Sequence, residues 1–227
     1  LARQYHLEKG NSQKYIVISR WESYHGMSLG ALSVAGGASN RNMFTPIIHP
    51  WPHIRQPSVK GVPPRMDPKD YAVQCARELE EAIHYTGAEY VSAFIATPLG
   101  QGEDCGLVPP VEYWQTIREI CDKYDILLIA DEVATGFGRT GRMFACNHEG
   151  VAPNLLCIAK GLTGGYLPLA ATLATEEIFD AFRGTPGEGR TFFHGHSYTG
   201  NPLGCAAALA SLGIFEAEGT LDALQPK

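Results

Sequence analysis

The chain has 227 residues, of which 44% are apolar and 19% charged, and its formal net charge is −6. This composition is typical of a globular protein and excludes disordered, collagen-like and coiled-coil chains. The balance is acidic and no Lys/Arg run is long enough to follow a phosphate backbone, so a nucleic-acid partner is disfavoured. The length allows one large α/β domain or two small ones.

The cysteines and the apolar runs indicate in which cellular compartment the protein is expected. Six cysteines are spread along the chain without a C-x-x-C pair, and a chain of this size does not depend on disulfides. We therefore expect a reducing, cytoplasmic environment. No run approaches the roughly 18 apolar residues of a membrane span, so no membrane association is expected. Residues 1–6 read as the end of an amphipathic helix entered partway through, which indicates a fragment of a longer protein.

Short apolar runs alternate with helical patterns along the chain. Such alternation builds βαβ units, which give a mainly parallel sheet covered by helices on both sides. In these sheets, functional residues gather just beyond the carboxyl ends of the strands. The runs that read as strands buried on both faces are 14–19, 90–96, 126–130, 155–159 and 169–174.

Three stretches carry helical periodicity. Pro68 stands at a first-turn position before apolar residues at three- and four-residue steps, and Gly87 ends that pattern. A second apolar stripe runs over 114–124, and a third, rich in small residues, runs over 201–218. Segment 44–68 is rich in Pro, Gly and His without a period, so we expect a long ordered loop over a site.

Two carboxylates, Asp131 and Glu132, follow the strand at 126–130 and precede a Gly-rich turn. A carboxylate buried at a strand end needs a partner, so such positions are often functional. One interpretation is a nucleotide hydrolase, since an apolar strand ending in Asp-Glu resembles a Walker B strand and 184–191 resembles a phosphate loop. Arg190 stands where that loop needs lysine, however, and a helical pattern precedes it in place of a strand.

A second interpretation is a metal site made of Asp131, Glu132, His194 and His196, because alternate histidines on a strand can share a metal. No H-E-x-x-H or Cys/His cluster supports it. With eight histidines in the chain, two close together are common and make hydrogen bonds to the backbone. We therefore expect no metal.

A third interpretation uses Lys160, which ends the strand at 155–159 and precedes a Gly-rich turn. A lysine here either extends into solvent or is desolvated. Desolvation would lower the pKa of its amine. A lowered amine pKa suits Schiff-base chemistry. Pyridoxal phosphate enzymes need a lysine for the cofactor's aldehyde and a carboxylate for its ring nitrogen. Lys160 and Asp131 meet this requirement.

Four blocks in order resemble the class III pyridoxal-phosphate aminotransferases of fold type I. They are Y-H-G at 24–26, A-D-E-V-A-T-G-F-G-R-T-G at 130–141, A-K-G-L-T-G-G-Y-L-P-L at 159–169 and H-G-H-S-Y-T-G-N-P-L at 194–203. The resemblance covers essentially the whole chain. It implies that 1–227 is most of a cofactor-binding large domain, an α/β fold with a mainly parallel, seven-stranded-type sheet between helices, incomplete at both ends.

The resemblance implies roles for the matching residues. Lys160 would be the catalytic residue, which binds pyridoxal phosphate as a Schiff base and moves the substrate's proton. Asp131 would pair with the protonated ring nitrogen. Val133 would pack on one face of the ring, and Tyr24 would stack on the other and face the substrate.

The resemblance also implies contributions from the block at 194–203. Ser197, where the family usually has threonine, would donate to the cofactor phosphate across a homodimer interface, so that the two subunits share the site. His196 would also bind the cofactor, and Gly195 would lie beside the substrate. For His25 and Glu132, hydrogen bonds that fix their loops are as plausible as a functional role. Arg139 is expected to be structural.

The chain departs from the family where relatives commonly have Glu-Pro and this sequence has Thr97-Pro98. In relatives that carboxylate helps to organise the cofactor's edge or a substrate-switching arginine, so its loss affects substrate handling. The resemblance also places the phosphate-binding loop before Leu1 and the small domain after Lys227, both beyond this chain.

The implied reaction is transamination from an amine or amino-acid donor to a keto acceptor. Ala134 and the blocks 164–170 and 194–201 look most like the diaminopelargonate-forming enzymes of biotin synthesis, which use 8-amino-7-oxononanoate. Thr97-Pro98 and segment 106–110 look more like ω-amino acid:pyruvate aminotransferases. A third possibility is a catalytically incompetent fragment.

Overall fold

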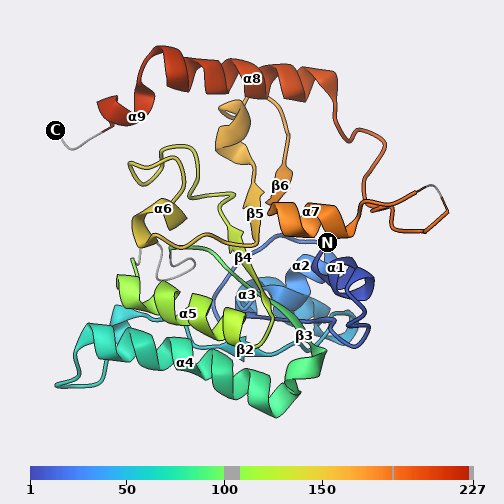
Figure 1. Ribbon diagram of the computed structural model, residues 1–227. Helices are drawn as coiled ribbons and strands as arrows, with labels where there is room; N and C mark the ends of the chain where they lie inside the picture. Colours follow the sequence, from blue (N-terminus) through green and yellow to red (C-terminus); the bar gives the residue numbers. More distant parts are fainter. Residues whose placement is uncertain (100–107, 186, 225–227) are drawn as a thin grey trace. The chain divides into compact units, whose positions relative to one another are not determined.

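The computed structural model describes residues 1–99, 108–185 and 187–224 (Figure 1). The chain divides into two compact units, Leu1–Ala130 and Asp131–Lys227, called the first and second unit below. Cys105 and the beginning of segment 106–110 lie outside the described residues.

The first unit is built on four parallel strands. They are β1 (Ile16–Arg20), β2 (His53–Ile54), β3 (Val91–Ala96) and β4 (Leu127–Asp131), and their spatial order is β2-β1-β3-β4. β4 is buried along its whole length and β3 at all but one residue. The prediction of a parallel sheet of buried strands is therefore confirmed for this part of the chain.

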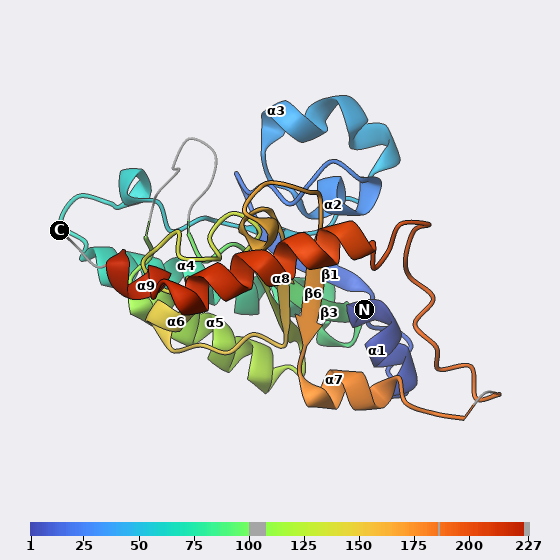
Figure 2. The same ribbon diagram turned by 90° about the horizontal axis from the view of Figure 1, so that it is seen from above.

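Helices and 3-10 turns connect the strands of the first unit. They are α1 (Ala2–Glu8), α2 (Leu29–Val34), α3 (Ala38–Arg41), η1 (Asn42–Ile47), η2 (Val59–Gly61), α4 (Pro68–Thr86), η3 (Ala88–Tyr90) and α5 (Val111–Lys123). Figures 1 and 2, which view the molecule at right angles, both show α4 and α5 side by side. The helices expected from Pro68 and from the stripe at 114–124 are thus confirmed.

The bounds of α4 follow from its end residues. The Asp67 carboxylate accepts a hydrogen bond from the Lys69 backbone N–H at 2.7 Å, and Pro68 fits the first turn because its missing N–H is not needed there. Gly87 ends the helix with φ +91° and donates its N–H to Ile83. The sequence signals at both ends therefore mark the helix correctly.

The second unit contains an antiparallel pair, β5 (Leu155–Ile158) and β6 (Ala171–Ala174). Its helices and turns are α6 (Cys146–Glu149), η5 (Lys160–Thr163), α7 (Glu176–Ala181), α8 (Pro202–Ala217) and α9 (Thr220–Ala223). Ile158, Leu162 and Ala208 form a small core, so β5, η5 and α8 pack together. The small-residue helix expected at 201–218 is confirmed as α8.

Two strand predictions are wrong in detail. β6 was expected to be buried on both faces, but three of its four residues are exposed, because among the described strands it pairs only with β5. β2 was not expected at all, and it lies inside the segment 44–68 that was assigned to a loop. β2 has only two residues, so it is too short to show any alternation in the sequence.

Among the described residues, no helix is long and apolar enough to cross a membrane. The described cysteines are all free thiols: Cys75, Cys121, Cys146, Cys157 and Cys205. They therefore contribute to packing and not to cross-links in this part of the chain.

Candidate active site

Asp131 ends β4 and opens the second unit. Its side chain is only 7% exposed, and its Oδ1 accepts a hydrogen bond from the Val133 backbone N–H at 3.1 Å. A short bond of this kind to a residue two positions later is typical of Asp at a turn. The carboxylate is therefore fixed at the mouth of the strand, as the sequence predicts.

Glu132 is fully buried and its carboxylate accepts three hydrogen bonds from its own loop. The donors are the Thr135 hydroxyl, the Ala145 backbone N–H at 2.9 Å and the Cys146 backbone N–H at 2.7 Å. The sequence left a functional and a loop-fixing role open for Glu132. Its contacts support the loop-fixing role, because they tie both ends of the Gly-rich segment to one side chain.

The Gly-rich segment itself folds back as a compact turn. The Phe137 backbone N–H donates to Met143 at 2.7 Å, and the Phe137 and Phe144 rings meet edge to face at 5.7 Å. Gly138 and Gly141 both have positive φ, which explains the glycines in this motif. Arg139 lies exposed within this turn.

Lys160 follows β5 and begins η5. Its φ is +44°, a left-handed conformation that is strained for a residue with a side chain and that is frequent at functional sites. The side chain is exposed in this structure, so of the two alternatives weighed from the sequence, extension into solvent is the one observed. The Lys160 carbonyl accepts a hydrogen bond from Gly165 at 3.3 Å, which closes the turn.

The segments that carry Asp131 and Lys160 are joined directly. The Glu132 backbone N–H donates to the Cys157 carbonyl on β5 at 2.9 Å. Burial raises the pKa of the Cys157 thiol to about 11, and the neighbouring Asp131 carboxylate adds to this increase. The end of β4 therefore lies beside β5, and the carboxylate stands close to the strand that leads to Lys160.

A second link runs through Phe137 and Gly161, two residues that the sequence reasoning did not single out. A Cβ atom on Gly161 would lie 2.8 Å from Cβ of Phe137, so only glycine fits under this ring. The turn after Asp131 thus rests on the turn after Lys160. The glycine directly after the lysine was the available signal, but nothing in the sequence shows which side chain needs the space.

The residues of the block at 194–203 precede α8. Gly195, His196 and Ser197 are exposed, and the backbone around them turns: His196 N–H donates to the Thr199 hydroxyl at 2.9 Å and Thr199 N–H to the His196 carbonyl at 2.9 Å. The Asn201 side chain caps α8 by accepting from the Leu203 and Gly204 N–H groups. The roles of Gly195, His196 and Ser197 stay predictions.

Tyr24 and His25 belong to the first unit, in the loop after β1. Tyr24 is 44% exposed. The loop is fixed behind it, because the Ser23 carbonyl accepts hydrogen bonds from Gly36 at 3.0 Å and Gly37 at 3.1 Å. The stacking role of Tyr24 stays a prediction.

Neither of the other two chemical interpretations gains support. Within the described residues, no group of three or more His, Cys, Asp and Glu side chains could hold a metal ion. The loop at 184–191 follows the helix α7 and not a strand, which is not the context of a nucleotide-binding phosphate loop.

Comparison with known families decides between the interpretations. The model of the family described as aminotransferase class-III matches residues 1–227. The chain belongs to the class-III aminotransferases. The expected fold class and family are therefore confirmed, and the family is pyridoxal phosphate-dependent.

Individual relatives of this class-III aminotransferase differ in their names. An adenosylmethionine-8-amino-7-oxononanoate aminotransferase from Geobacter sulfurreducens is 45% identical over all of this chain and 50% of its own length. A putrescine–pyruvate aminotransferase from Pseudomonas aeruginosa is 42% identical over 96% of the chain and 47% of its own length. The crystal structure of a PLP-bound amine transaminase from an uncultivated Pseudomonas species is 42% identical, with a TM-score of 0.88 over 96% of this chain and 49% of that one. The chain thus spans about half the length of these relatives.

The side chains present fit pyridoxal phosphate. The cofactor needs an amine for its aldehyde and a carboxylate for its ring nitrogen. This class-III aminotransferase has an exposed lysine amine and a buried, locally held carboxylate on two joined segments of one unit. Lys160 and Asp131 therefore fit the donor set that the cofactor requires.

Replacing Gly161 by alanine is expected to disturb this donor set. The new methyl group would overlap Cβ of Phe137, and such overpacking costs about 1–3 kcal/mol. We expect a lower melting temperature and weaker binding of pyridoxal phosphate, measured by circular dichroism and by absorbance. Gly187→Ala is the control, because a Cβ there meets no atom within 4 Å. Equal behaviour of the two variants would contradict the role of Gly161.

The partly buried thiols of Cys146 and Cys157 predict a loss of stability in alkali. Burial raises the pKa of Cys146 to about 12 and that of Cys157 to about 11, with the Glu132 and Asp131 carboxylates adding to it. The folded state therefore keeps both thiols protonated where the unfolded chain loses the protons, above a pKa of 9.0. These two thiols should leave the free energy of unfolding unchanged up to about pH 9. At higher pH it should fall by about 2–3 kcal/mol through Cys157, and Cys146, which is closer to solvent, should add to the fall. Urea titrations from pH 8 to 11 measure this, and Cys157→Ala should flatten the curve; an identical curve for the variant would refute it.

Proposed function

We propose that this chain is the cofactor-binding part of an enzyme that transfers an amino group from an amine or amino-acid donor to a keto acceptor. The observation that carries the proposal is the direct joining of the Asp131 and Lys160 segments by the Glu132–Cys157 hydrogen bond. The acceptor we propose is 8-amino-7-oxononanoate, as in the Geobacter sulfurreducens relative. The sequence blocks around Ala134 favoured the same substrate.

Bound pyridoxal phosphate supplies an electron sink that stabilises negative charge on the amino-bearing carbon of the substrate. Lys160 would hold the cofactor through its amine, and the same amine, once free, would move the proton at that carbon. The Asp131 carboxylate would keep the ring nitrogen protonated, because an opposite charge stabilises the protonated form. Its hydrogen bond from Val133 holds it in place for this task.

The remaining contacts are proposed from the family resemblance. Val133 and Tyr24 cover the two ring faces, and Tyr24 and Gly195 border the substrate. His196 and Ser197 contribute to cofactor binding, with Ser197 donating to the phosphate of the neighbouring subunit. A homodimer with shared sites is part of this proposal, and its exposed turn at 194–200 supports the assignment because these groups are open to a second chain.

We also propose a cytoplasmic location. Free thiols are stable in a reducing compartment, and the described cysteines form no disulfide with one another.

Two alternatives to the substrate assignment have an observation in their favour. Thr97-Pro98 resembles ω-amino acid:pyruvate aminotransferases, and the Pseudomonas aeruginosa relative named for putrescine and pyruvate is 42% identical. The third possibility, a catalytically incompetent chain, is favoured by its length, which is about half that of its relatives.

Cofactor attachment tests the proposal. The 227-residue chain is incubated with pyridoxal phosphate, reduced with borohydride, digested and analysed by mass spectrometry. We expect the cofactor mass on the peptide with Lys160 and on no peptide of the Lys160→Ala variant. Lys9→Ala, which removes an exposed lysine of the first unit, is the control and should label as the parent does. Labelling that persists in Lys160→Ala would refute the assignment.

A substrate screen separates the three alternatives. The cofactor-loaded chain is given a panel of amine donors with either 8-amino-7-oxononanoate or pyruvate, and the aminated product is measured. Faster turnover of 8-amino-7-oxononanoate supports the main proposal, faster turnover of pyruvate supports the second, and attachment to Lys160 without turnover supports the third.

A further inference from the structure

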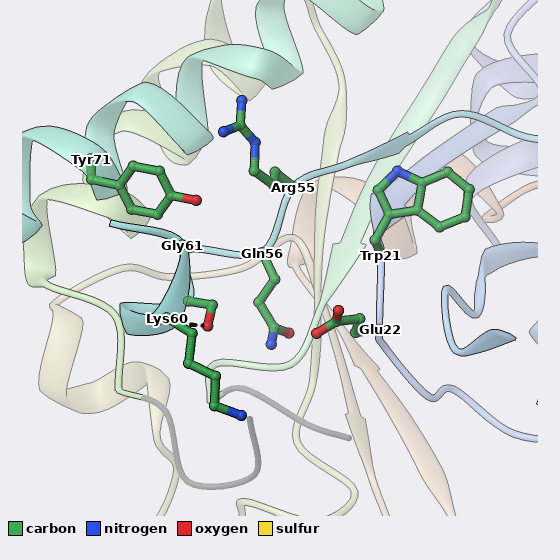
Figure 3. Close-up of a pocket in the computed structure, with 8 residues that line it drawn as sticks. Trp21, Glu22, Arg55, Gln56, Lys60, Gly61 and Tyr71 are labelled. Atoms are coloured by element: carbon green, nitrogen blue, oxygen red, sulfur yellow. Dashed lines mark hydrogen bonds between the residues drawn. The ribbon is translucent and has the colours of Figure 1, made fainter. Parts of the chain in front are cut away.

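A cavity of about 320 Å³ lies in the first unit (Figure 3). Its walls come from the loop after β1, the segment after β2, the turn η2 and the first part of α4. Trp21, Glu22, Gln56, Lys60 and Tyr71 are the lining residues that bear on its chemistry. The volume is within the range of small-molecule sites.

Gln56 is the unusual group in this cavity. It is only 4% exposed, and within the part of the chain that the structure describes both ends of its amide, Nε2 and Oε1, are buried without a hydrogen-bond partner. Figure 3 shows the amide pointing into the cavity, between Glu22 and Lys60. Buried amides are almost always paired, because an unpaired donor or acceptor costs free energy. The amide therefore offers one donor and one acceptor to an occupant of the cavity.

The walls around Gln56 are fixed in place. The Trp21 backbone N–H donates to Ile54 at 2.9 Å, which ties the β1 loop to β2. Gly61 packs so tightly on Tyr71 that a Cβ would lie 2.3 Å from the phenol oxygen. The cavity is thus preformed, and an occupant would not have to order the chain around it.

Glu22 adds a strained backbone at the rim. Its φ is +61°, in the left-handed region that residues with a side chain seldom adopt. The conformation is imposed by the close approach of Gly36, where a Cβ would lie 2.3 Å from the Arg20 carbonyl oxygen. Strain of this kind is frequent where a side chain must be aimed at a ligand.

The charges of the lining do not favour an ion. Glu22 and Lys60 have opposite signs, and the Arg55 guanidinium at the rim is bonded to the Glu78 carboxylate. The Trp21 indole does not face the occupant, because it stacks on the His53 ring at 4.5 Å, carries the Arg41 guanidinium at 5.6 Å and points away from Gln56 (Figure 3). A neutral molecule fits this lining better than a carboxylate or an ammonium group.

We propose that this cavity binds a neutral planar heterocycle of nucleobase size whose edge carries a donor beside an acceptor. Such an edge pairs with both ends of the Gln56 amide, which is the geometry by which Gln side chains bind adenine. All lining residues of the cavity lie in the first unit, and none of them has a role in the proposed amino transfer.

Binding of two related purines to the 227-residue chain tests the proposal without any cofactor. Adenine carries an exocyclic amine beside a ring acceptor, whereas purine lacks the amine. In equilibrium dialysis, adenine should bind and purine should bind about tenfold more weakly or worse, since one arm of the paired contact is lost. Equal binding of the two, or no binding of adenine, would overturn the proposal. Because no cofactor is present, neither result depends on transamination.

Variants then assign the contact to Gln56. Gln56→Leu keeps the approximate size and removes both polar ends, so adenine affinity should fall about tenfold or more. Gln74→Leu changes an exposed glutamine on α4 and should leave the affinity unchanged. Gln56→Glu keeps an acceptor and loses the donor, so it should also weaken the binding of adenine. If circular dichroism shows that Gln56→Leu is unfolded, Gln56→Glu is measured in its place. Unchanged adenine affinity in a folded Gln56 variant would refute the role of this residue.

Discussion

Replacing Glu132 by alanine is expected to lower the free energy of unfolding by about 3–5 kcal/mol. The substitution leaves the Thr135 hydroxyl and the Ala145 and Cys146 N–H groups without their acceptor, and each buried unpaired donor costs about 1–3 kcal/mol. Removing the buried charge offsets part of this loss, so the expected destabilisation is smaller than the sum of the largest costs of three unpaired donors. Urea denaturation followed by circular dichroism measures it.

A second substitution separates charge from hydrogen bonding. Glu132→Gln keeps the size but presents an NH₂ group to some of the same donors, so we expect a loss between those of alanine and the parent. Glu216→Ala, on the exposed side of α8, is the control and should change stability by less than about 0.5 kcal/mol. A loss below about 1 kcal/mol for Glu132→Ala would show that the loop does not depend on its carboxylate.

The same variant bears on the proposed site. Glu132 fixes the loop that carries Phe137, and Phe137 rests on Gly161, next to Lys160. We therefore expect that Glu132→Ala also weakens pyridoxal phosphate binding, although Glu132 itself is not proposed to touch the cofactor. A buried residue adjacent to Asp131 in sequence thus acts on the site through the packing of two turns.

The strands and long helices were predictable because their signals are local. A run such as 126–130 is apolar throughout, and α4 has a capping Asp67, a first-turn proline and a final Gly87. The short strand β2 carries too few residues for a pattern, and the exposure of β6 depends on which strands pair with it and not on its own sequence. Local composition therefore identifies elements better than it identifies their surroundings.

The site shows the same division. Asp131 and Lys160 could be proposed from the sequence because pyridoxal phosphate chemistry needs those residue types and both stand at strand ends. The loop-fixing role of Glu132 was one of two open alternatives, and only its three donors, up to 14 positions away, decide between them. The unpaired amide of Gln56 left no signal at all, because pairing is a property of the fold and not of the residue type.

Replacing Thr97 should reveal the cost of a buried charge in the first unit. Arg20 is fully buried, and its Nη2 donates only to uncharged oxygens, at 2.6 Å to the Thr97 carbonyl and at 3.3 Å to the Leu99 carbonyl and the Thr97 hydroxyl. Among the described residues, its Nε and Nη1 have no hydrogen-bond partner. The Tyr113 and Trp114 rings, 5.9 and 6.0 Å from the guanidinium carbon, compensate the charge only in part. A carboxylate at position 97, where relatives of the resembled family commonly have glutamate, would supply the missing counter-charge.

The informative comparison is Thr97→Glu against Thr97→Gln. Both side chains are larger than threonine and bring the same overpacking, about 1–3 kcal/mol, so their difference isolates the charge. We expect the glutamate variant to be more stable at pH 7 by about 2–3 kcal/mol, the usual value of a hydrogen bond to a charged group with its partner buried. Pairing with Arg20 would hold the pKa of the new carboxyl below its unfolded value of about 4.3, so the advantage should persist above that pH and disappear as the carboxyl is protonated at lower pH. Urea titrations of both variants at pH 7 and pH 3 measure the difference, and equal stabilities at pH 7 would mean that the two aromatic rings and the carbonyls already satisfy Arg20.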